Sequence, residues 1–153
     1  GYFGKKDKEE SYQIIKSNII ELKEEIKKNK WDVKLSHETT GKNSVFGSLK
    51  ETLRLSKETR TSFCIDFAHL KARNQGVIDF EEIIEEIGHK NFHMHYSGIN
   101  YGPKGEKNHI PIDVKEFKKL AKALKKHKIS GEIICESPNT IQDSINMEKI
   151  LKE

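Results

Sequence analysis

The sequence has little cysteine, no long hydrophobic run and no large excess of one charge. Only two of its 153 residues are cysteines, Cys64 and Cys135, and both lie in apolar segments. We therefore expect buried, reduced thiols rather than a disulfide. No apolar run approaches the roughly 18 residues that span a bilayer, and residues 1–6 lack the hydrophobic core of a signal peptide. These absences predict a soluble, cytoplasmic protein.

The charge balance does not indicate a dedicated DNA-binding domain. There are 28 Lys and Arg residues against 24 Asp and Glu residues, a net charge of +4. The densest basic segment is residues 115–128, where Phe117, Leu120, Ala121 and Leu124 recur at helical spacing. We interpret its lysines as the solvated face of an amphipathic helix, with a phosphate-binding surface as the alternative.

Helical and strand patterns alternate along the chain, which indicates a parallel α/β architecture. Apolar spacing predicts helices over about residues 8–30, 48–57, 80–87, 115–126 and 140–151. Strands are predicted at residues 31–37, 62–65, 91–95 and 131–135. The length corresponds to one domain over residues 1–153, or to part of a larger one.

The segment 97–111 is predicted to be a long irregular loop. Gly98, Gly102, Pro103 and Gly105 fall within it, and they disfavour regular structure. A loop of this length in a compact α/β domain is more often functional than not.

A polar side chain with metal-binding capacity follows each predicted strand. These residues are Glu38, Asp66, His95 and Glu136. In parallel α/β barrels, the carboxyl ends of the strands form the rim on which active sites are built. One such residue would mean little, because polar residues commonly start loops or cap helices. Four at equivalent positions predict a shared site.

A shared site favours a barrel over a flat sheet. In a flat sheet the outer two of four adjacent strands lie about 14 Å apart, too far for their side chains to share a metal at about 2.0–2.2 Å. Barrel curvature brings the strand ends together. We therefore predict an α/β fold of the (β/α)₈ TIM-barrel type, with only about four βα units in this chain and hence a partial barrel.

Further donors lie close to these positions. His69 comes three residues after Asp66, and Glu106 and His109 lie in the long loop. Carboxylates and imidazoles without a set of thiolates suit catalytic Zn²⁺, Mn²⁺ or Fe²⁺. Alternation along the strand is taken to turn one of His93 and His95 away from the barrel interior, and His93 is interpreted as a packing residue.

Four segments resemble the endonuclease IV family of apurinic/apyrimidinic endonucleases, within the xylose-isomerase-like barrel superfamily. They are His37-Glu38-Thr39-Thr40-Gly41-Lys42, Cys64-Ile65-Asp66-Phe67-Ala68-His69, His93-Met94-His95 and Ile134-Cys135-Glu136-Ser137-Pro138. The resemblance implies a cluster of up to three Zn²⁺ ions, with Mn²⁺ or Mg²⁺ as alternatives. It implies ligands at Glu38, Asp66, His69, His95 and Glu136, with Glu38 and Glu136 in catalytic roles.

The sequence departs from the family pattern in two places. The Asp-x-His motif of the family appears here as Glu106-Lys107-Asn108-His109, so His109, with Glu106 behind it, is the candidate there. Two further histidine ligands of the family would lie upstream of Gly1. The chain is therefore expected to be the carboxyl-terminal part of a barrel, and the isolated piece is expected to bind metal weakly and to lack activity.

The resemblance implies hydrolysis of a phosphodiester at abasic sites in duplex DNA. Arg73, Tyr96, Tyr101 and Lys104 are then candidates for contact with phosphate or sugar. Sugar isomerases and epimerases of the superfamily place similar residues around one or two ions, and they remain an alternative, as do a non-catalytic binding role and an inactive fragment. Extra imidazoles at His69 and His109 favour the hydrolase. Exposed strand edges also leave pairing with a second copy open.

Overall fold

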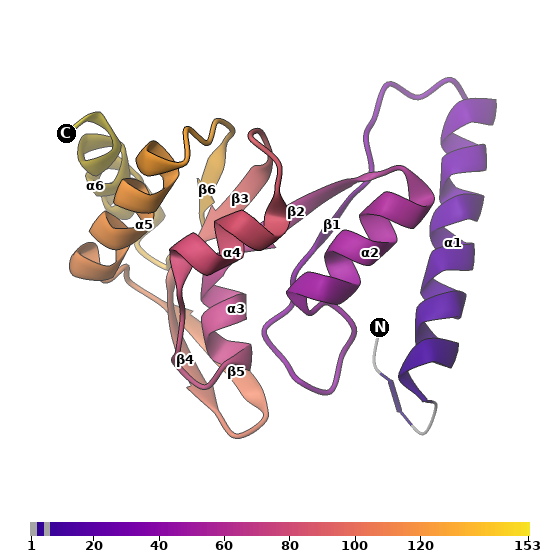
Figure 1. The fold of residues 1–153 in the computed structure, drawn as a ribbon, viewed down its shortest axis with the longest axis horizontal. Helices are drawn as coiled ribbons and strands as arrows, with labels where there is room; N and C mark the ends of the chain where they lie inside the picture. Colours follow the sequence, from indigo (N-terminus) through magenta and orange to yellow (C-terminus); the bar gives the residue numbers. More distant parts are fainter. Residues whose placement is uncertain (1–2, 5–6) are drawn as a thin grey trace.

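The chain folds into a parallel β-sheet with helices packed on one face (Figure 1). The computed structural model describes residues 3–4 and 7–153. Its four-stranded sheet has the order β1-β2-β3-β6, and all neighbouring pairs are parallel. The strands are β1 (Ser36–Glu38), β2 (Ser62–Asp66), β3 (His93–Tyr96) and β6 (Ile133–Cys135). The predicted α/β architecture with a parallel sheet is confirmed.

The predicted helices are present, and one further helix was not predicted. They are α1 (Lys8–Lys28), α2 (Leu49–Thr59), α4 (Phe80–Ile87), α5 (Val114–Lys126) and α6 (Thr140–Lys152). Ser48 and Glu51 form a capping box at the start of α2, and Gly88 ends α4 in the left-handed conformation. The additional helix is α3 (Phe67–Arg73), which begins directly after β2.

Alternation along the strands separates a helix-covered face from an open face. Phe63, Ile65 and Met94 are buried against apolar side chains of α4, α5 and α6 in the main core. Ile134 points to the opposite side of the sheet and is 46% exposed. The open face therefore carries the polar side chains that alternate with the core residues.

The predicted loop at 97–111 is a β-hairpin, so that prediction was wrong. Strands β4 (Gly98–Gly102) and β5 (Gly105–Ile110) pair antiparallel, with an irregularity at Asn100 and Tyr101. The hairpin packs on α3 through a small cluster of Ala68, Ala72 and Ile99. In Figure 1 it lies beside α3, at the end of the sheet where the parallel strands finish. It therefore extends the rim at the carboxyl ends of the strands.

The first strand is shorter than predicted. Period-two alternation indicated a strand over residues 31–37, but β1 pairs with β2 only from Ser36 onward. Strand β1 lies at the edge of the sheet, and its one neighbour begins at Ser62, so the preceding residues have no strand beside them. Trp31 and Val33 are accordingly more than half exposed.

A second, smaller core joins α1 to α2. Phe3, Tyr12, Phe46 and Leu55 are buried together. The guanidinium of Arg54 lies over the Tyr12 ring at 3.8 Å from its centroid. This core attaches α1 to the part of the molecule that carries β1 and the loop after it.

Two expectations from composition can be compared with the structure. Cys64 and Cys135 are both free and buried, as predicted. In the described part of the chain, no helix combines the length and apolar character needed to cross a bilayer.

Candidate metal centre

Asp66 is the most deeply buried acidic group at the rim. It is the last residue of β2 and the N-cap of α3, where one carboxylate oxygen accepts a hydrogen bond from the backbone N–H of His69 at 2.8 Å. The side chain is 0% exposed, and Oδ2 accepts no hydrogen bond. A buried carboxylate oxygen without a partner is costly. The nearest cationic group is His69, whose Nδ1 lies 3.5 Å away, so this oxygen is free to bind a cation.

Thr39 holds the backbone around this carboxylate. Its Oγ1 accepts a hydrogen bond from the N–H of Asp66 at 2.9 Å and donates to the Asp66 carbonyl at 3.3 Å. Its carbonyl accepts a hydrogen bond from His69 Nδ1 at 2.9 Å. Sequence analysis did not assign this residue a role. The signal available for it was its place beside Glu38, immediately beyond the strand.

A first group of four donors spans all four strands. Glu38, Asp66, His95 and Glu136 each place one ligand atom within 4.8 Å of the others. His95 Nδ1 lies 3.1 Å from Glu38 Oε1 and 3.0 Å from Glu136 Oε1. Strands β1 and β6 are separated by two strands, about 14 Å in a flat sheet, so the approach of Glu38 to Glu136 within 4.8 Å fits the predicted curvature.

A second donor group shares two residues with the first. Asp66, His69, His109 and Glu136 also have ligand atoms within 4.8 Å of one another. His109 belongs to β5, so the hairpin contributes directly to the rim. The two groups together contain six residues, all of which the sequence analysis predicted as metal ligands.

Backbone carbonyls fix which nitrogens of His69 and His109 are available. His69 Nδ1 faces the Thr39 carbonyl at 2.9 Å, and His109 Nδ1 faces the Glu136 carbonyl at 3.0 Å. A carbonyl can only accept, so both Nδ1 atoms carry the proton. The two Nε2 atoms then face each other at 3.2 Å. Two nitrogens bound to one tetrahedral Zn²⁺ would lie roughly 3.3 Å apart, close to the spacing in this structure.

Glu106 lies beside this pair of imidazoles. Its Oε2 is 3.6 Å from His69 Nε2, and its Oε1 is 4.0 Å from His109 Nε2. Its N–H donates to the Gly41 carbonyl at 2.9 Å. A side chain at Gly41 would clash, because an added Cβ would lie 2.5 Å from Glu106 Cβ. The glycine therefore lets the hairpin approach the loop after β1 closely enough to place Glu106 at the rim.

The charges of the cluster shift the pKa values of its members. Burial alone would lower the pKa of His69, but hydrogen bonding to Glu38 and the charges of Asp66 and Glu106 raise it to about 9. Burial alone would raise the pKa of Glu38, but His69 and His95 lower it. Burial raises the pKa of Asp66. Without metal, a proton on His69 balances part of the carboxylate charge.

Hydrogen bonds also hold the segment that carries Glu136. The Glu136 N–H donates to the Tyr96 carbonyl at 3.1 Å. One residue later, the Ser137 hydroxyl donates to Asp143 Oδ2 in α6, and the same carboxylate oxygen accepts from the N–H of Ile112 at 3.1 Å. The chain after β6 is thereby tied to both α6 and the segment that follows the hairpin.

The structure separates the four predicted substrate contacts into two kinds. Tyr101 is 36% exposed on β4, and Lys104 is exposed at the tip of the hairpin. Both side chains lie on the surface of the hairpin that carries His109, and their contact with substrate stays a prediction.

Of the other two, Tyr96 contradicts its prediction, whereas the predicted contact of Arg73 with substrate stays a prediction. The Nη1 of Arg73 donates to the carbonyls of Lys42 at 2.6 Å and of Thr40 at 3.2 Å, so it braces the loop after β1. Tyr96 is 1% exposed, and its hydroxyl donates to Glu116 Oε2 at 3.3 Å. It is a core residue because it follows His95 and points to the opposite face of the sheet.

The interpretation of His93 as a packing residue was also wrong. Residues two apart on a strand point to the same face, so His93 faces the open side together with His95. The Nε2 atoms of the two rings are 3.2 Å apart.

The donor set fits a divalent metal. Its atoms are carboxylate oxygens and imidazole nitrogens, which suit Zn²⁺ and Mn²⁺. Asp66 Oδ2 accepts no hydrogen bond, so it can bind a cation. The Nε2 atoms of His69 and His109 share a hydrogen bond at 3.2 Å, which a cation bound to both nitrogens would replace.

Comparisons with known proteins agree with this architecture. The family model described as xylose isomerase-like TIM barrel matches residues 1–153. An uncharacterized protein of Methanocaldococcus jannaschii is 39% identical over 166 residues, an alignment that covers 100% of this chain and 61% of that relative. The chain thus spans less than two thirds of the relative's length. No solved structure matches significantly. The chain belongs to the xylose isomerase-like TIM barrel family.

Proposed function

We propose that this protein is a metal-dependent phosphodiester hydrolase that acts at abasic sites in DNA. The observation that carries the proposal is the overlap of two donor groups, which share Asp66 and Glu136. Shared carboxylates hold two cations near each other, and paired cations stabilise both the attacking and the leaving oxygen of a phosphodiester. The similarity to a relative without an assigned activity supports the fold only, so the activity rests on the site.

The hydrolase accounts for donors that a simpler metal enzyme would leave unused. Glu38, Asp66, His95 and Glu136 alone would suffice for a sugar isomerase with one or two ions. His69, His109 and Glu106 form a further set on the hairpin side. These residues supply the second cation position, and two neighbouring positions suit a phosphate with several charged oxygens.

Each residue has a task that follows from its surroundings. Divalent cations would supply a water-derived nucleophile near neutral pH and would neutralise the charge of the phosphate. Glu38 and Glu136 lie on either side of His95 and hold the first cation position. His69 and His109 hold the second position with fixed ring orientations, because each donates its Nδ1–H to a backbone carbonyl.

The surface around the rim fits an extended anionic substrate. Lys42, Lys104 and Lys107 are exposed on the loop after β1 and on the hairpin, and Lys42 pairs with Gly105 between the two segments. These cations flank the donor groups and can contact backbone phosphates. An abasic nucleotide can leave the helical stack at low cost, because it has no base pair to lose.

Incision of a duplex oligonucleotide with one abasic site tests the proposal. We expect the intact protein that contains this chain, with added Zn²⁺ or Mn²⁺, to incise this duplex but not an undamaged one. Glu136→Gln should reduce the rate at least a hundredfold, whereas Glu148→Gln, at an exposed position of α6, should leave it unchanged. Metal content by elemental mass spectrometry is measured on the same samples.

Two results would overturn the assignment. Conversion of small sugars without incision of abasic DNA would identify an isomerase. Normal incision by Glu136→Gln would show that the donor groups are not the active site.

A further inference from the structure

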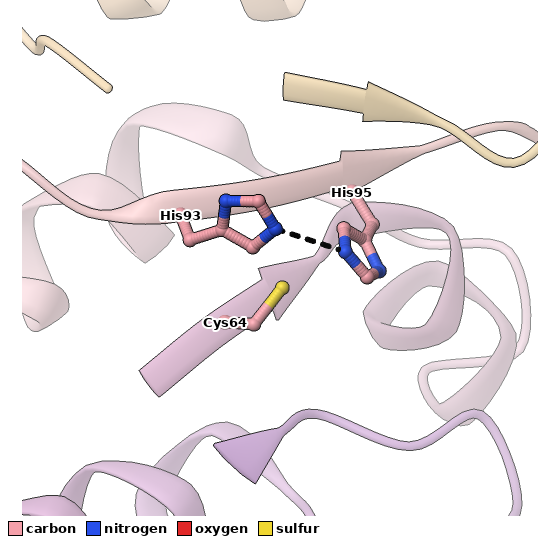
Figure 2. A group of neighbouring side chains, drawn as sticks. All are labelled: Cys64, His93 and His95. Atoms are coloured by element: carbon pink, nitrogen blue, oxygen red, sulfur yellow. Dashed lines mark hydrogen bonds between the residues drawn. The ribbon is translucent and has the colours of Figure 1, made fainter. Parts of the chain in front are cut away.

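A third group of donors lies deeper on the open face of the sheet. Cys64 on β2 is the register partner of His93 on β3, and Asp66 is the partner of His95. The Cys64 Sγ and one nitrogen of each histidine lie within 4.8 Å of one another. Figure 2 shows the sulfur of Cys64 directed toward the two imidazole rings of the neighbouring strand. The group is therefore built by adjacent strands and not by mobile loops.

The spacing within this group matches tetrahedral coordination. The Nε2 atoms of His93 and His95 are 3.2 Å apart, the same separation as between His69 and His109. Two nitrogens on one tetrahedral Zn²⁺ would lie roughly 3.3 Å apart, with a thiolate bond of about 2.3 Å to the third donor. The two nitrogens therefore have the spacing of ligands of one ion, and the Cys64 Sγ lies within 4.8 Å of a nitrogen of each ring.

We propose that Cys64, His93 and His95 form a separate metal site for a borderline-soft ion of the Zn²⁺ class. A thiolate with two imidazoles selects a softer ion than the carboxylate-rich groups at the rim. Three protein donors leave a fourth position open to water. The site shares His95 with the first donor group, but Cys64 and His93 belong to neither group at the rim. The inference concerns metal binding by these two side chains and does not depend on the hydrolase activity.

His95 links this site to the rim. Its Nδ1 faces Glu38 and Glu136, while its Nε2 faces His93. If both nitrogens bound metal, the neutral ring would release its one N–H proton and would bridge the two ions as imidazolate. The Cys64 thiol also gives up its proton to solvent on binding, and burial together with nearby carboxylates raises the pKa of this thiol. Binding at this site therefore releases protons.

A hydrogen bond between His93 and His95 is the competing explanation of their distance. In that arrangement one Nε2–H donates to the other Nε2, and His93 positions the ring of His95 without binding an ion. Cys64 would then take no part. The two explanations differ in whether the thiolate contacts metal.

Cobalt titration of the metal-free protein distinguishes them. Co²⁺ bound to a thiolate gives a near-ultraviolet charge-transfer absorption that carboxylate and imidazole ligands do not give. We expect this absorption to saturate at one ion per chain in the wild type and to disappear in Cys64→Ser. His93→Asn should weaken the apparent affinity for this ion at least tenfold.

The second cysteine supplies the matched control. Cys135 is buried in the helix-covered core, so Cys135→Ser should retain the absorption, with circular dichroism used to confirm the fold of each variant. Absence of the absorption in the folded wild type, or its persistence in Cys64→Ser, would overturn the site. Incision of abasic DNA is scored separately, so loss of the proposed function with retained charge transfer would leave this inference standing.

Discussion

At the scale of single residues, the rim is organised by groups that do not themselves bind metal. Thr39 is the clearest example. Its hydroxyl accepts a hydrogen bond from the N–H of Asp66, and its carbonyl accepts one from His69 Nδ1. It is 0% exposed and sits between two proposed ligands. Such supporting contacts fix ligand orientation and are expected to matter nearly as much as the ligands.

Replacement of Thr39 by valine tests this support. The change keeps the shape of the side chain but leaves the buried N–H of Asp66 without its acceptor. We expect a loss of about 1–3 kcal/mol in the free energy of unfolding, together with weaker metal binding. Urea denaturation and metal titration measure the two effects. Unchanged stability and affinity would mean that the contact is dispensable.

The four donor residues that follow the strands could be predicted from sequence, but the direction of neighbouring side chains only in part. Glu38, Asp66, His95 and Glu136 were found from their position after strands. Alternation was then misapplied to His93, which shares a face with His95. The same alternation places Tyr96 in the core. The role of Arg73 was hidden because its carbonyl partners lie in a loop about 30 residues away.

At the scale of elements, the β4–β5 hairpin depends on a close contact with the loop after β1. Gly105 has a φ of +94°, and an added Cβ would lie 2.1 Å from the Gly41 carbonyl oxygen. Gly105→Ala should therefore displace the hairpin and move Glu106 and His109 away from His69. The expected result is loss of metal from the second donor group, measured by isothermal titration calorimetry.

Gly102→Ala provides the control for this change. An added Cβ there meets only the flexible side chain of Lys107, so metal binding should remain within about twofold of the wild type. Equal metal stoichiometry in both variants would contradict the proposed role of the contact between Gly105 and Gly41.

The hairpin could not be predicted because its glycines were interpreted as breaking regular structure. In the folded protein they permit a tight antiparallel pairing against another segment, which is a tertiary effect. Helices were easier to predict, since caps such as Ser48 and Gly88 are local signals. Helix α3 was missed because its seven residues are too few to show a clear helical period.

Arg54 of α2 contacts Glu9 of α1, and this contact should depend on pH. The hydrogen bond from Arg54 lowers the pKa of Glu9 from 4.5 to about 2. Hydrogen bonds from Lys16 and then Arg54 lower the pKa of Glu58 to about 2 as well. A lowered pKa in the folded state adds stability above the unfolded value and loses it as the pH falls through about 2. Arg54→Gln should therefore narrow the difference in melting temperature between pH 6 and pH 2.5.

Circular dichroism melting curves at the two pH values measure this effect. All three side chains are exposed, so we expect a modest change. Lys118→Gln, which removes an exposed contact to Glu153 near the carboxyl end, serves as the comparison. An identical pH dependence in wild type and Arg54→Gln would rule out the contact as the source of acid sensitivity.

At the scale of the whole molecule, metal binding and folding should be coupled. The donors come from four strands and the hairpin, so only the folded chain brings them together. A ligand present at a hundred times its dissociation constant stabilises the folded state by about 2.7 kcal/mol. For a chain of this size that corresponds to a rise of roughly 5–10 °C in melting temperature.

Differential scanning calorimetry with and without a chelator measures this coupling. The metal-dependent rise should shrink in Asp66→Asn, because the unpartnered buried oxygen is lost as a ligand. If chelation leaves the melting temperature unchanged in the wild type, the donor groups do not hold metal with useful affinity.

The curved sheet also has a consequence for kinetics. The donors of each rim group come from segments that are far apart in the sequence. The end of β1, the hairpin and the end of β6 must therefore all be folded before an ion can bind all of its ligands. The ion therefore gains most of its binding energy after the folding transition state. Bound metal should therefore slow unfolding far more than it speeds folding. The metal-bound protein should also resist proteolysis longer than the metal-free protein, because it opens less often.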